Sequence, residues 1–177
     1  MRIISGSLKT RRFNAPGNLP TRPTTDRAKE SLFNILHHEF DLTNITVLDL
    51  FAGIGSISFE FLSRGAIEVI SVDKHPKCVQ FIKSQSQAFE LKNHLIYRQD
   101  AFKAIFLAKK KFDIVFADPP YDLPNIPDIH KKVFEADILA EGGWLIIEHG
   151  HDTSLSDLDN FQFSKSYGKS NFSIFSK

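Results

Sequence analysis

The sequence predicts an α/β fold in which a mostly parallel, seven-stranded sheet carries helices on both faces and ends in an antiparallel hairpin. Two observations lead to this prediction. Apolar runs of strand length alternate with stretches of helical periodicity as far as Glu148, a pattern typical of parallel strands joined by right-handed crossovers. Beyond residue 160, two segments of alternating apolar and polar residues follow each other without an intervening helix, which indicates a hairpin at the sheet edge.

The predicted elements can be placed along the chain in order. A first helix is expected over 24–40, because Thr25 suits an N-cap and Leu32 and Leu36 fall on one apolar face. Further helices are expected over 75–91, over 126–139 and, more briefly, from Ser56 as an N-cap. The strands are expected at 45–50, 67–72, 94–98, 112–117, 143–148, 161–167 and 171–175.

The composition limits the class of protein. A chain of 177 residues with 42% hydrophobic content is the usual size of one domain, so a single domain over 1–177 and a monomer are expected. Cys78 is the only cysteine, which excludes an intrachain disulfide and favours a reducing compartment. No apolar run approaches the ~18 residues of a membrane span, and no signal segment is present, so we expect a cytoplasmic protein without membrane association.

Basic residues concentrate at the N-terminus. Residues 1–31 contain seven basic and two acidic side chains, whereas the rest of the chain contains 15 basic and 19 acidic ones. A basic extension on a mildly acidic domain favours contact with a nucleic-acid backbone, and the alternative is a solvated tail. The candidate contacts are Arg2, Lys9, Arg11, Arg12 and Arg22.

The segment Asp118-Pro119-Pro120-Tyr121 directly follows the apolar strand predicted at 112–117. A nucleobase amino group is a poor nucleophile, because its lone pair is conjugated with the ring. A carboxylate and a neighbouring carbonyl can accept both N–H bonds and turn that lone pair toward an electrophile. The prolines restrict the backbone without adding N–H donors, and the tyrosine offers a face on which a base can stack. The alternative is an ordinary proline-rich turn.

A glycine-rich turn follows an earlier strand. Asp49 ends this strand, and Gly53-Ile54-Gly55 then leads into a short apolar helix. Glycines let the backbone approach a ligand closely, and the helix start offers free N–H groups. Asp73 ends the next strand, 18 residues after Gly55, near the spacing expected of a ribose-binding acid.

Four acids therefore follow the ends of successive strands, namely Asp49, Asp73, Asp100 and Asp118. In an open α/β sheet the carboxyl ends of the strands form the ligand-binding edge, so we expect these carboxylates to surround one pocket. Asp100, followed by Ala101 and Phe102, is placed to bind an adenine amino group. Each of the first three acids also has a structural alternative, as a cap of the following loop or helix.

The kind of cofactor follows from the same residues. An NAD site would require a third glycine where Ser58 stands, and Asp49 would face the negative pyrophosphate of a dinucleotide. A cofactor that carries an ammonium and a sulfonium suits this carboxylate better, which favours S-adenosylmethionine over NAD. A metal is not expected, because His149-x-His151 beside Glu148 is the only spacing that comes into consideration.

Together these motifs resemble a class I S-adenosylmethionine-dependent methyltransferase with a DPPY motif. The segments Met1–Gly6, Arg22–Leu36 and Tyr167–Ser170 are similar to the RsmD family, whose members methylate the exocyclic N2 of a guanine in 16S ribosomal RNA. The resemblance covers essentially the whole chain. It implies a Rossmann-like fold and a 16S ribosomal RNA substrate, within the small ribosomal subunit or an assembly intermediate, with 1–31 as a basic extension for RNA contact.

The resemblance also implies roles for individual residues. Asp118 and the Pro119 carbonyl would hold the amino group, and Tyr121 would stack on the flipped base. Thr24 and Thr25 would close the cofactor side of the pocket. The residues expected to bind the cofactor are Asp49, Phe51, Gly53, Gly55, Asp73, Asp100, Ala101, Thr24 and Thr25.

Three other functions remain open from the sequence. A DNA adenine-N6 or cytosine-N4 methyltransferase can use the same tetrad, but it usually needs a recognition domain for which this chain has little room. A protein-glutamine methyltransferase acts on an amide nitrogen, whereas the basic extension favours a polyanion. A non-catalytic RNA-binding protein would not require four carboxylates around a cofactor pocket.

Overall fold

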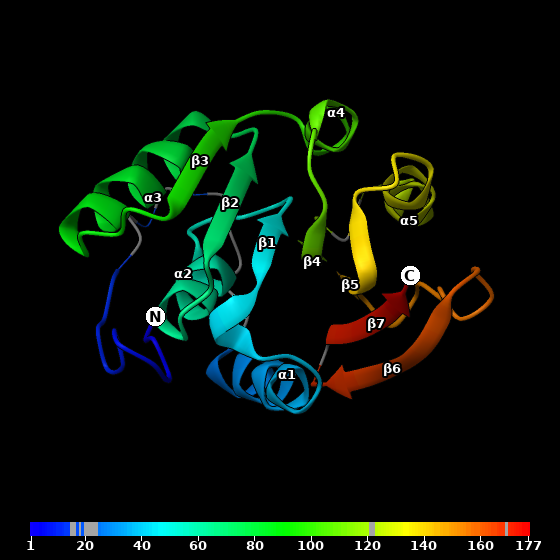
Figure 1. Ribbon diagram of the computed structural model, residues 1–177, viewed down its shortest axis with the longest axis horizontal. Coiled ribbons are helices and arrows are strands. Elements are labelled where there is room, and N and C mark those ends of the chain that lie inside the picture. Colours follow the sequence, from blue (N-terminus) through cyan, green and yellow to red (C-terminus); the bar gives the residue numbers. More distant parts are fainter. Residues whose placement is uncertain (15–16, 18, 20–24, 121–122, 169) are drawn as a thin grey trace.

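The computed structural model describes residues 1–14, 17, 19, 25–120, 123–168 and 170–177. Figure 1 shows the elements, coloured along the chain. The helices are α1 (Asp26–Glu39), α2 (Ser56–Ser63), α3 (Pro76–Ala88), α4 (Ala101–Leu107), α5 (Ile126–Glu135) and the 3-10 turn η1 (Leu42–Asn44). The strands are β1 (Thr46–Asp49), β2 (Glu68–Asp73), β3 (His94–Arg98), β4 (Phe112–Ala117), β5 (Leu139–His149), β6 (Phe161–Tyr167) and β7 (Ser170–Ser176).

The strands form one seven-stranded sheet in the order β3-β2-β1-β4-β5-β7-β6. The first five strands in this order pair in parallel, and β7 pairs antiparallel with both β5 and β6. The predicted α/β fold with its C-terminal antiparallel hairpin is therefore confirmed. The chain reverses its direction of winding between β1 and β4, which are neighbours in the sheet although β2 and β3 lie between them in sequence.

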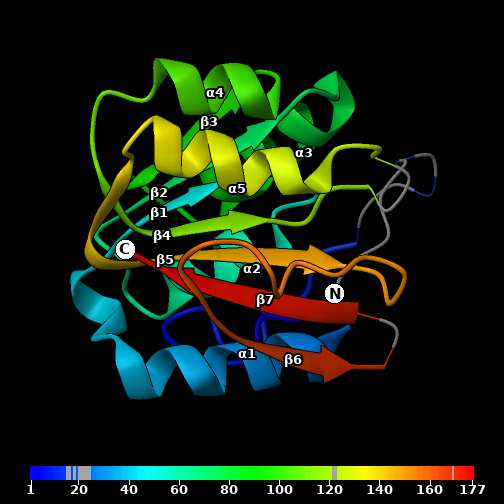
Figure 2. The ribbon, with the colours of Figure 1, turned by 90° about the vertical axis from the view of Figure 1, so that its right-hand side faces the viewer.

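Helices cover both faces of the sheet, as predicted. Figure 2 shows α4 and α5 on one side and α1 and α2 on the other. Side chains of β4 alternate between the two layers, because successive residues of a strand point to opposite faces. Ile114 and Phe116 join the core beneath α1 and α2, whereas Val115 and Ala117 join the core beneath α4 and α5. Trp144 is a core residue, with its ring 5.2 Å from that of Phe40.

The boundaries of β5 differ from those predicted. The helix expected to reach 139 ends at Glu135, and β5 begins at Leu139 rather than at Gly143. The pairing with β4 shifts register between Phe112 and Ile114, and Gly142 within this irregular stretch has φ of +73°. The expected strand start at residue 143 therefore lies just after an irregular stretch within a longer strand.

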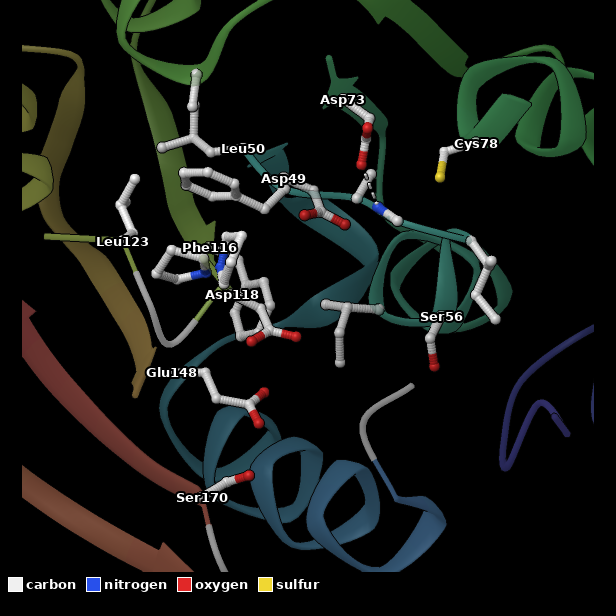
Figure 3. Close-up of a pocket in the computed structure, with 18 of the residues that line it drawn as sticks. Asp49, Leu50, Ser56, Asp73, Cys78, Phe116, Asp118, Leu123, Glu148 and Ser170 are labelled. Atoms are coloured by element: carbon white, nitrogen blue, oxygen red, sulfur yellow. Dashed lines mark hydrogen bonds between the residues drawn. The ribbon is translucent and has the colours of Figure 1, made fainter. Parts of the chain in front are cut away.

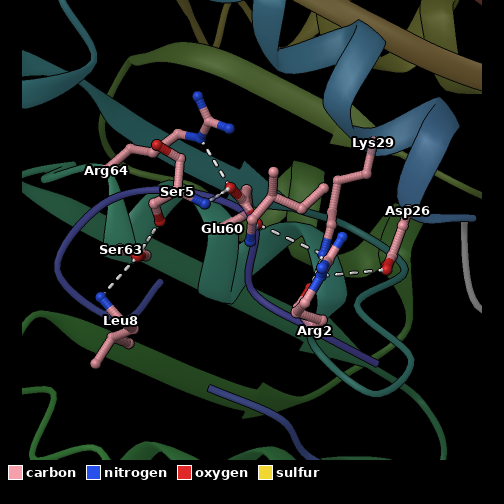
Figure 4. Close-up of polar contacts among 9 residues, drawn as sticks. Arg2, Ser5, Leu8, Asp26, Lys29, Glu60, Ser63 and Arg64 are labelled. Atoms are coloured by element: carbon pink, nitrogen blue, oxygen red, sulfur yellow. Dashed lines mark hydrogen bonds and ion pairs between the residues drawn. The ribbon is translucent and has the colours of Figure 1, made fainter. Parts of the chain in front are cut away.

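The N-terminal arm, residues 1–14, is fixed to the domain. Ile3 and Phe13 are buried in the core beneath α1 and α2. Glu60 of α2 accepts hydrogen bonds from the backbone N–H groups of Ile4 (2.9 Å) and Ser5 (3.1 Å). Figure 4 shows the arm wrapped around this carboxylate. A solvated tail is therefore the wrong description of the arm over these residues.

A buried ion pair stabilises the same junction. The Nζ atom of Lys29 lies 3.5 Å from a carboxylate oxygen of Glu60, and both side chains are fully buried. Lys29 also donates a 2.7 Å hydrogen bond to the carbonyl of Arg2. Burial lowers the pKa of Lys29, and the Glu60 carboxylate opposes this shift. Removing one partner of such a pair leaves the other charge buried without compensation, so the arm, α1 and α2 depend on one another.

Candidate active site

A cavity of about 1080 Å³ opens at the carboxyl ends of the central strands. It lies where the strand order reverses between β1 and β4, the usual ligand site of an open α/β sheet. Its volume is at or above the upper end of the ~300–1,000 Å³ typical of small-molecule pockets, which leaves room for two ligands side by side. The predicted site residues that line it are Thr25, Asp49, Phe51, Gly53, Asp73, Asp100, Ala101, Asp118, Pro119 and Pro120.

The glycine turn forms one wall of this pocket. Gly53 and Gly55 have φ of +55° and +80°, a left-handed conformation that glycine adopts without strain. Gly53 lines the pocket, whereas Gly55 does not. A Cβ atom on Gly55 would lie 2.7 Å from Cε2 of Phe59, so this glycine permits close packing of the turn on the helix behind it.

The start of α2 differs from the prediction. Gly55, not Ser56, is the N-cap, and Ser56 is the first helical residue. The Ser56 hydroxyl is buried and has no hydrogen-bond partner among the described residues. A glycine N-cap provides no side-chain acceptor, so the cap itself occupies none of the N–H groups of the first turn.

Asp73 at the end of β2 holds the glycine turn. One carboxylate oxygen accepts from the N–H of Gly53 (2.8 Å), and the other accepts from the N–H of His75 (2.7 Å). Asp73 therefore holds the loop before α3, but it does not cap that helix, because His75 is the N-cap and α3 has no side-chain cap bond. Because each carboxylate oxygen can accept two hydrogen bonds, Asp73 retains capacity for ribose hydroxyls within the pocket that it lines.

Asp49 at the end of β1 is almost completely buried, with 1% of its surface exposed. Its Oδ2 atom accepts a 2.5 Å hydrogen bond from the Ser58 hydroxyl, whereas Oδ1 has no partner among the described residues. Burial raises the pKa of Asp49 to about 7, the Ser58 hydrogen bond opposes the shift, and the Asp73 charge adds to it. A cationic ligand would compensate this carboxylate, so the site fits the sulfonium or ammonium of S-adenosylmethionine.

Asp100 caps α4 through a 3.2 Å hydrogen bond from the N–H of Lys103, so its predicted alternative as an N-cap is also present. Ala101 is buried, and Phe102 lies beside it in the pocket wall. The pocket thus offers one carboxylate and two apolar side chains at the position predicted for adenine.

Asp118 follows β4 and lies across the pocket from the glycine turn (Figure 3). Burial raises its pKa well above the ordinary value, and the charges of Glu148 and Asp49 raise it further. A raised pKa makes a carboxylate a stronger base. Pro119 is buried, and the Pro120 carbonyl accepts a 2.9 Å hydrogen bond from the N–H of Leu123. Tyr121 lies outside the described residues, as does Thr24 on the cofactor side.

The sequence analysis missed several residues of the pocket. Glu148 at the end of β5 is 3% exposed and lines the cavity next to Asp118. It is an acid at a strand end like the four predicted ones, and this pattern could have identified it. Arg27 from α1 and a group around the β6–β7 turn also line the cavity. Parts of both segments carry the family resemblance, but the sequence analysis gave them no place in the pocket. The residues from the turn are Ser166, Tyr167, Gly168 and Ser170.

No metal site is found among the residues that the structure describes. His149, which the sequence analysis considered as a ligand, contacts the Ser173 hydroxyl through Nε2 (2.8 Å) and the Gly150 carbonyl through Nδ1 (2.9 Å). His151 contacts the Gly168 carbonyl instead (2.9 Å). Both rings are therefore engaged in contacts within the protein. The described part of the chain also contains no helix long and apolar enough to cross a membrane.

The candidate RNA contacts on the arm are exposed. Arg2 lies 3.7 Å from Asp26, and the Arg11 guanidinium lies 5.9 Å from the ring centre of Phe89. Lys9 and Arg12 are exposed as well. None of these four side chains lines the pocket, and Arg22 lies outside the described residues. The basic side chains of the arm therefore lie on the surface, outside the pocket that the acidic residues line.

A family model described as "Conserved hypothetical protein 95" matches residues 1–176 of the chain. The chain belongs to this family, the RsmD family. The resemblance to the RsmD family inferred from the sequence motifs is thereby confirmed over essentially the whole length of this chain.

Curated relatives and solved structures agree with this membership. Bacillus subtilis YlbH is 40% identical over 161 residues, which cover 89% of this chain and 86% of the relative. The Escherichia coli protein named "Ribosomal RNA small subunit methyltransferase D" is 31% identical over 150 residues, covering 84% of this chain and 71% of the relative. The structure of Escherichia coli yhhF matches with a TM-score of 0.87 and 24% identity over 100% of this chain and 97% of that chain. The predicted Rossmann-like methyltransferase fold is therefore confirmed.

Proposed function

We propose that this protein transfers a methyl group from S-adenosylmethionine to the exocyclic N2 amino group of a guanine in small-subunit ribosomal RNA. The observation that carries the proposal is the position of Asp118, a half-buried carboxylate with a raised pKa that faces the glycine turn across one pocket. The family of the chain and the name of its Escherichia coli relative support ribosomal RNA as the substrate.

The cofactor side consists of Asp49, Gly53, Asp73 and Asp100. S-adenosylmethionine, when bound, supplies an electrophilic methyl group attached to a sulfonium. Asp73 accepts bonds from the ribose hydroxyls, and Asp100 accepts from the adenine amino group while Phe102 packs on the ring. Asp49 compensates the positive charge of the ligand with a carboxylate that has an unpaired oxygen in the described structure.

The acceptor side consists of Asp118, Pro119 and Tyr121. Asp118 and the Pro119 carbonyl accept the two N–H bonds of the amino group, which aims the nitrogen lone pair at the methyl carbon. Bound S-adenosylmethionine would supply the methyl group, and its sulfur would keep the electrons of the carbon–sulfur bond, while Asp118 would accept the proton that nitrogen releases. Alignment of the reacting atoms supplies most of the acceleration. Tyr121 stacks on the base, which leaves the RNA stack at a cost of a few kcal/mol.

The chain is proposed to act as one domain, with its basic N-terminal extension on RNA. The arm is fixed to α1 and α2 by the Lys29–Glu60 pair, so its exposed Arg11 and Arg12 keep a defined position relative to the pocket. Such an arrangement suits a substrate whose backbone is held at one place while a single base enters the pocket.

The experiment that tests this proposal is methyl transfer with labelled S-adenosylmethionine and small ribosomal subunits or 16S RNA from a strain that lacks the gene. Mass mapping of the product should find one added methyl group on the N2 atom of one guanine. Parallel reactions contain duplex DNA and a glutamine-containing protein substrate. Methylation of either of these, with none of the RNA, would overturn the proposal in favour of the alternatives that use the same tetrad.

A further inference from the structure

Glu148 occupies a position equivalent to that of Asp118 on the neighbouring strand. β4 and β5 run in parallel, and Ala117 pairs with Ile147 at the end of their ladder. Asp118 and Glu148 are each the next residue along the chain, so both side chains reach the same end of the sheet. Figure 3 shows their carboxyl groups directed toward one another within the pocket.

The two carboxylates interact electrostatically at close range. The Glu148 charge raises the pKa of Asp118, and Glu148 itself is only 3% exposed. Burying two like charges together is costly unless hydrogen-bond donors compensate them. Glu148 lines the pocket and also has contacts within the protein, and each carboxylate oxygen can accept more than one hydrogen bond. A ligand with two adjacent N–H donors could bond to both carboxyl groups at once.

Guanine has this arrangement of donors. Its exocyclic N2 amino group and its ring N1–H lie side by side on the Watson–Crick edge. Adenine and cytosine present an unprotonated ring nitrogen beside their amino groups, and this lone pair would face the second carboxylate. A flipped base is read through hydrogen bonds to that edge. The pair of acceptors therefore matches guanine and opposes the other two amino-bearing bases.

We infer that Glu148 selects guanine by accepting the N1–H bond while Asp118 accepts the N2 amino group. This inference rests on the proposed function and adds to it a residue that determines which base is methylated. Sites built to pair with a substrate N–H group reject analogues without it strongly, because the buried acceptor is then left unpaired. The DPPY tetrad positions an amino group of any base, and Glu148 supplies the discrimination that the tetrad lacks.

The test uses the nucleotide that wild-type protein methylates, identified first by mass mapping. Two substrate RNAs are prepared, one with guanosine and one with 2-aminopurine riboside at that position. 2-Aminopurine keeps the amino group but has no N1–H. In single-turnover reactions, wild-type protein should prefer guanosine roughly 100-fold. Glu148→Gln should reduce this preference to less than about 10-fold, because the amide can donate to the bare N1 of 2-aminopurine.

A matched control is available on the same strand. Glu141 carries the same side chain at the opposite end of β5, is exposed, and pairs with Lys177. Glu141→Gln should retain the full preference for guanosine. Thermal melting and calorimetric affinity for S-adenosylhomocysteine show whether Glu148→Gln has kept its fold and cofactor site. If it has not, Glu148→Asp provides the same comparison, and guanosine turnover should fall more than 2-aminopurine turnover.

Two outcomes would overturn the inference. If folded Glu148→Gln slows both substrates by the same factor, the carboxylate acts only through its charge. If wild-type protein shows no preference for guanosine, no residue reads the N1–H bond. Failure of the proposed function is a separate result, because wild-type protein would then methylate no guanine in the first mapping experiment.

Discussion

Ser58 donates a 2.5 Å hydrogen bond to Asp49 at the base of the cofactor pocket. The contact continues away from the pocket, because Ser71 donates to Ser58 (2.7 Å) and contacts Nε2 of His94 (2.7 Å). Burial lowers the pKa of His94 to about 4, so this ring is neutral at physiological pH. The other carboxylate oxygen of Asp49 is buried and has no hydrogen-bond partner among the described residues.

This relationship predicts that cofactor binding releases a proton near neutral pH. Asp49 has a pKa of about 7 in the folded protein, and a cationic ligand favours its ionised form. Affinity for S-adenosylmethionine should therefore rise from pH 5.5 to pH 7.5. Calorimetry in buffers of different ionisation enthalpy measures the proton directly. Asp49→Asn should abolish the release, and its persistence in this variant would assign the proton to another group.

The raised pKa of Asp49 also makes the free energy of unfolding depend on pH. The pKa of Asp49 is higher in the folded than in the unfolded chain, so the folded state holds the proton longer. The contribution of Asp49 to the free energy of unfolding is therefore fully present below about pH 4 and is lost as pH rises toward 7. Asp49→Asn should flatten this part of the stability profile in urea melts, without ligand, across pH 4–7.

Asp118→Asn should remove methyl transfer while the fold remains. The amide cannot accept both the amino N–H bond and the released proton, so the single-turnover rate should fall ~10²-fold or more, the range of general-base catalysis. Affinity for S-adenosylhomocysteine should stay within about threefold of wild type. Asp157→Asn, an exposed change of the same kind, is the control. Near-normal turnover by Asp118→Asn would show that the tetrad has no catalytic role and is an ordinary proline-rich turn.

Gly55→Ala should destabilise the protein and weaken cofactor binding together. The alanine would have to keep φ of +80°, and its Cβ would lie 2.7 Å from Phe59. We expect this combination to cost ~2–3 kcal/mol. Gly142→Ala is the matched control, because Gly142 has φ of +73° with nothing within 4 Å and lies far from the pocket. The control should lose only ~1–2 kcal/mol and keep its cofactor affinity. Equal loss in both variants would show that contact with Phe59 is unimportant.

Neutralising Arg11 and Arg12 should weaken RNA binding and reduce its dependence on salt. Each phosphate contact removed lowers the slope of log affinity against log salt concentration by about 0.7–0.9. Lys131→Gln with Lys132→Gln on α5 removes the same charge from another surface and should leave the slope almost unchanged. Binding assays from 50 to 300 mM salt provide the comparison. Identical slopes for the two double variants would remove the arm from the RNA interface.

Local sequence determined the fold class and most of the candidate site. Apolar runs of strand length, separated by helical periodicity, predict the parallel sheet because burial on both faces requires them. Acids at the ends of successive strands predict the pocket, because parallel strands bring their carboxyl ends to one edge. The helix caps of Thr25 and Asp100 were also predictable, since a cap depends on contacts three residues apart.

Only the tertiary structure decided which contacts form between segments that are distant in sequence. Glu148 became a pocket residue through its register against β4, and the N-terminal arm became ordered through the Lys29–Glu60 pair with α1 and α2. The pKa of Asp49 depends on burial beneath several elements. Local periodicity carries no information about strand register, ion pairs between remote residues or desolvation, because each of these arises only when separate segments exclude water from one another.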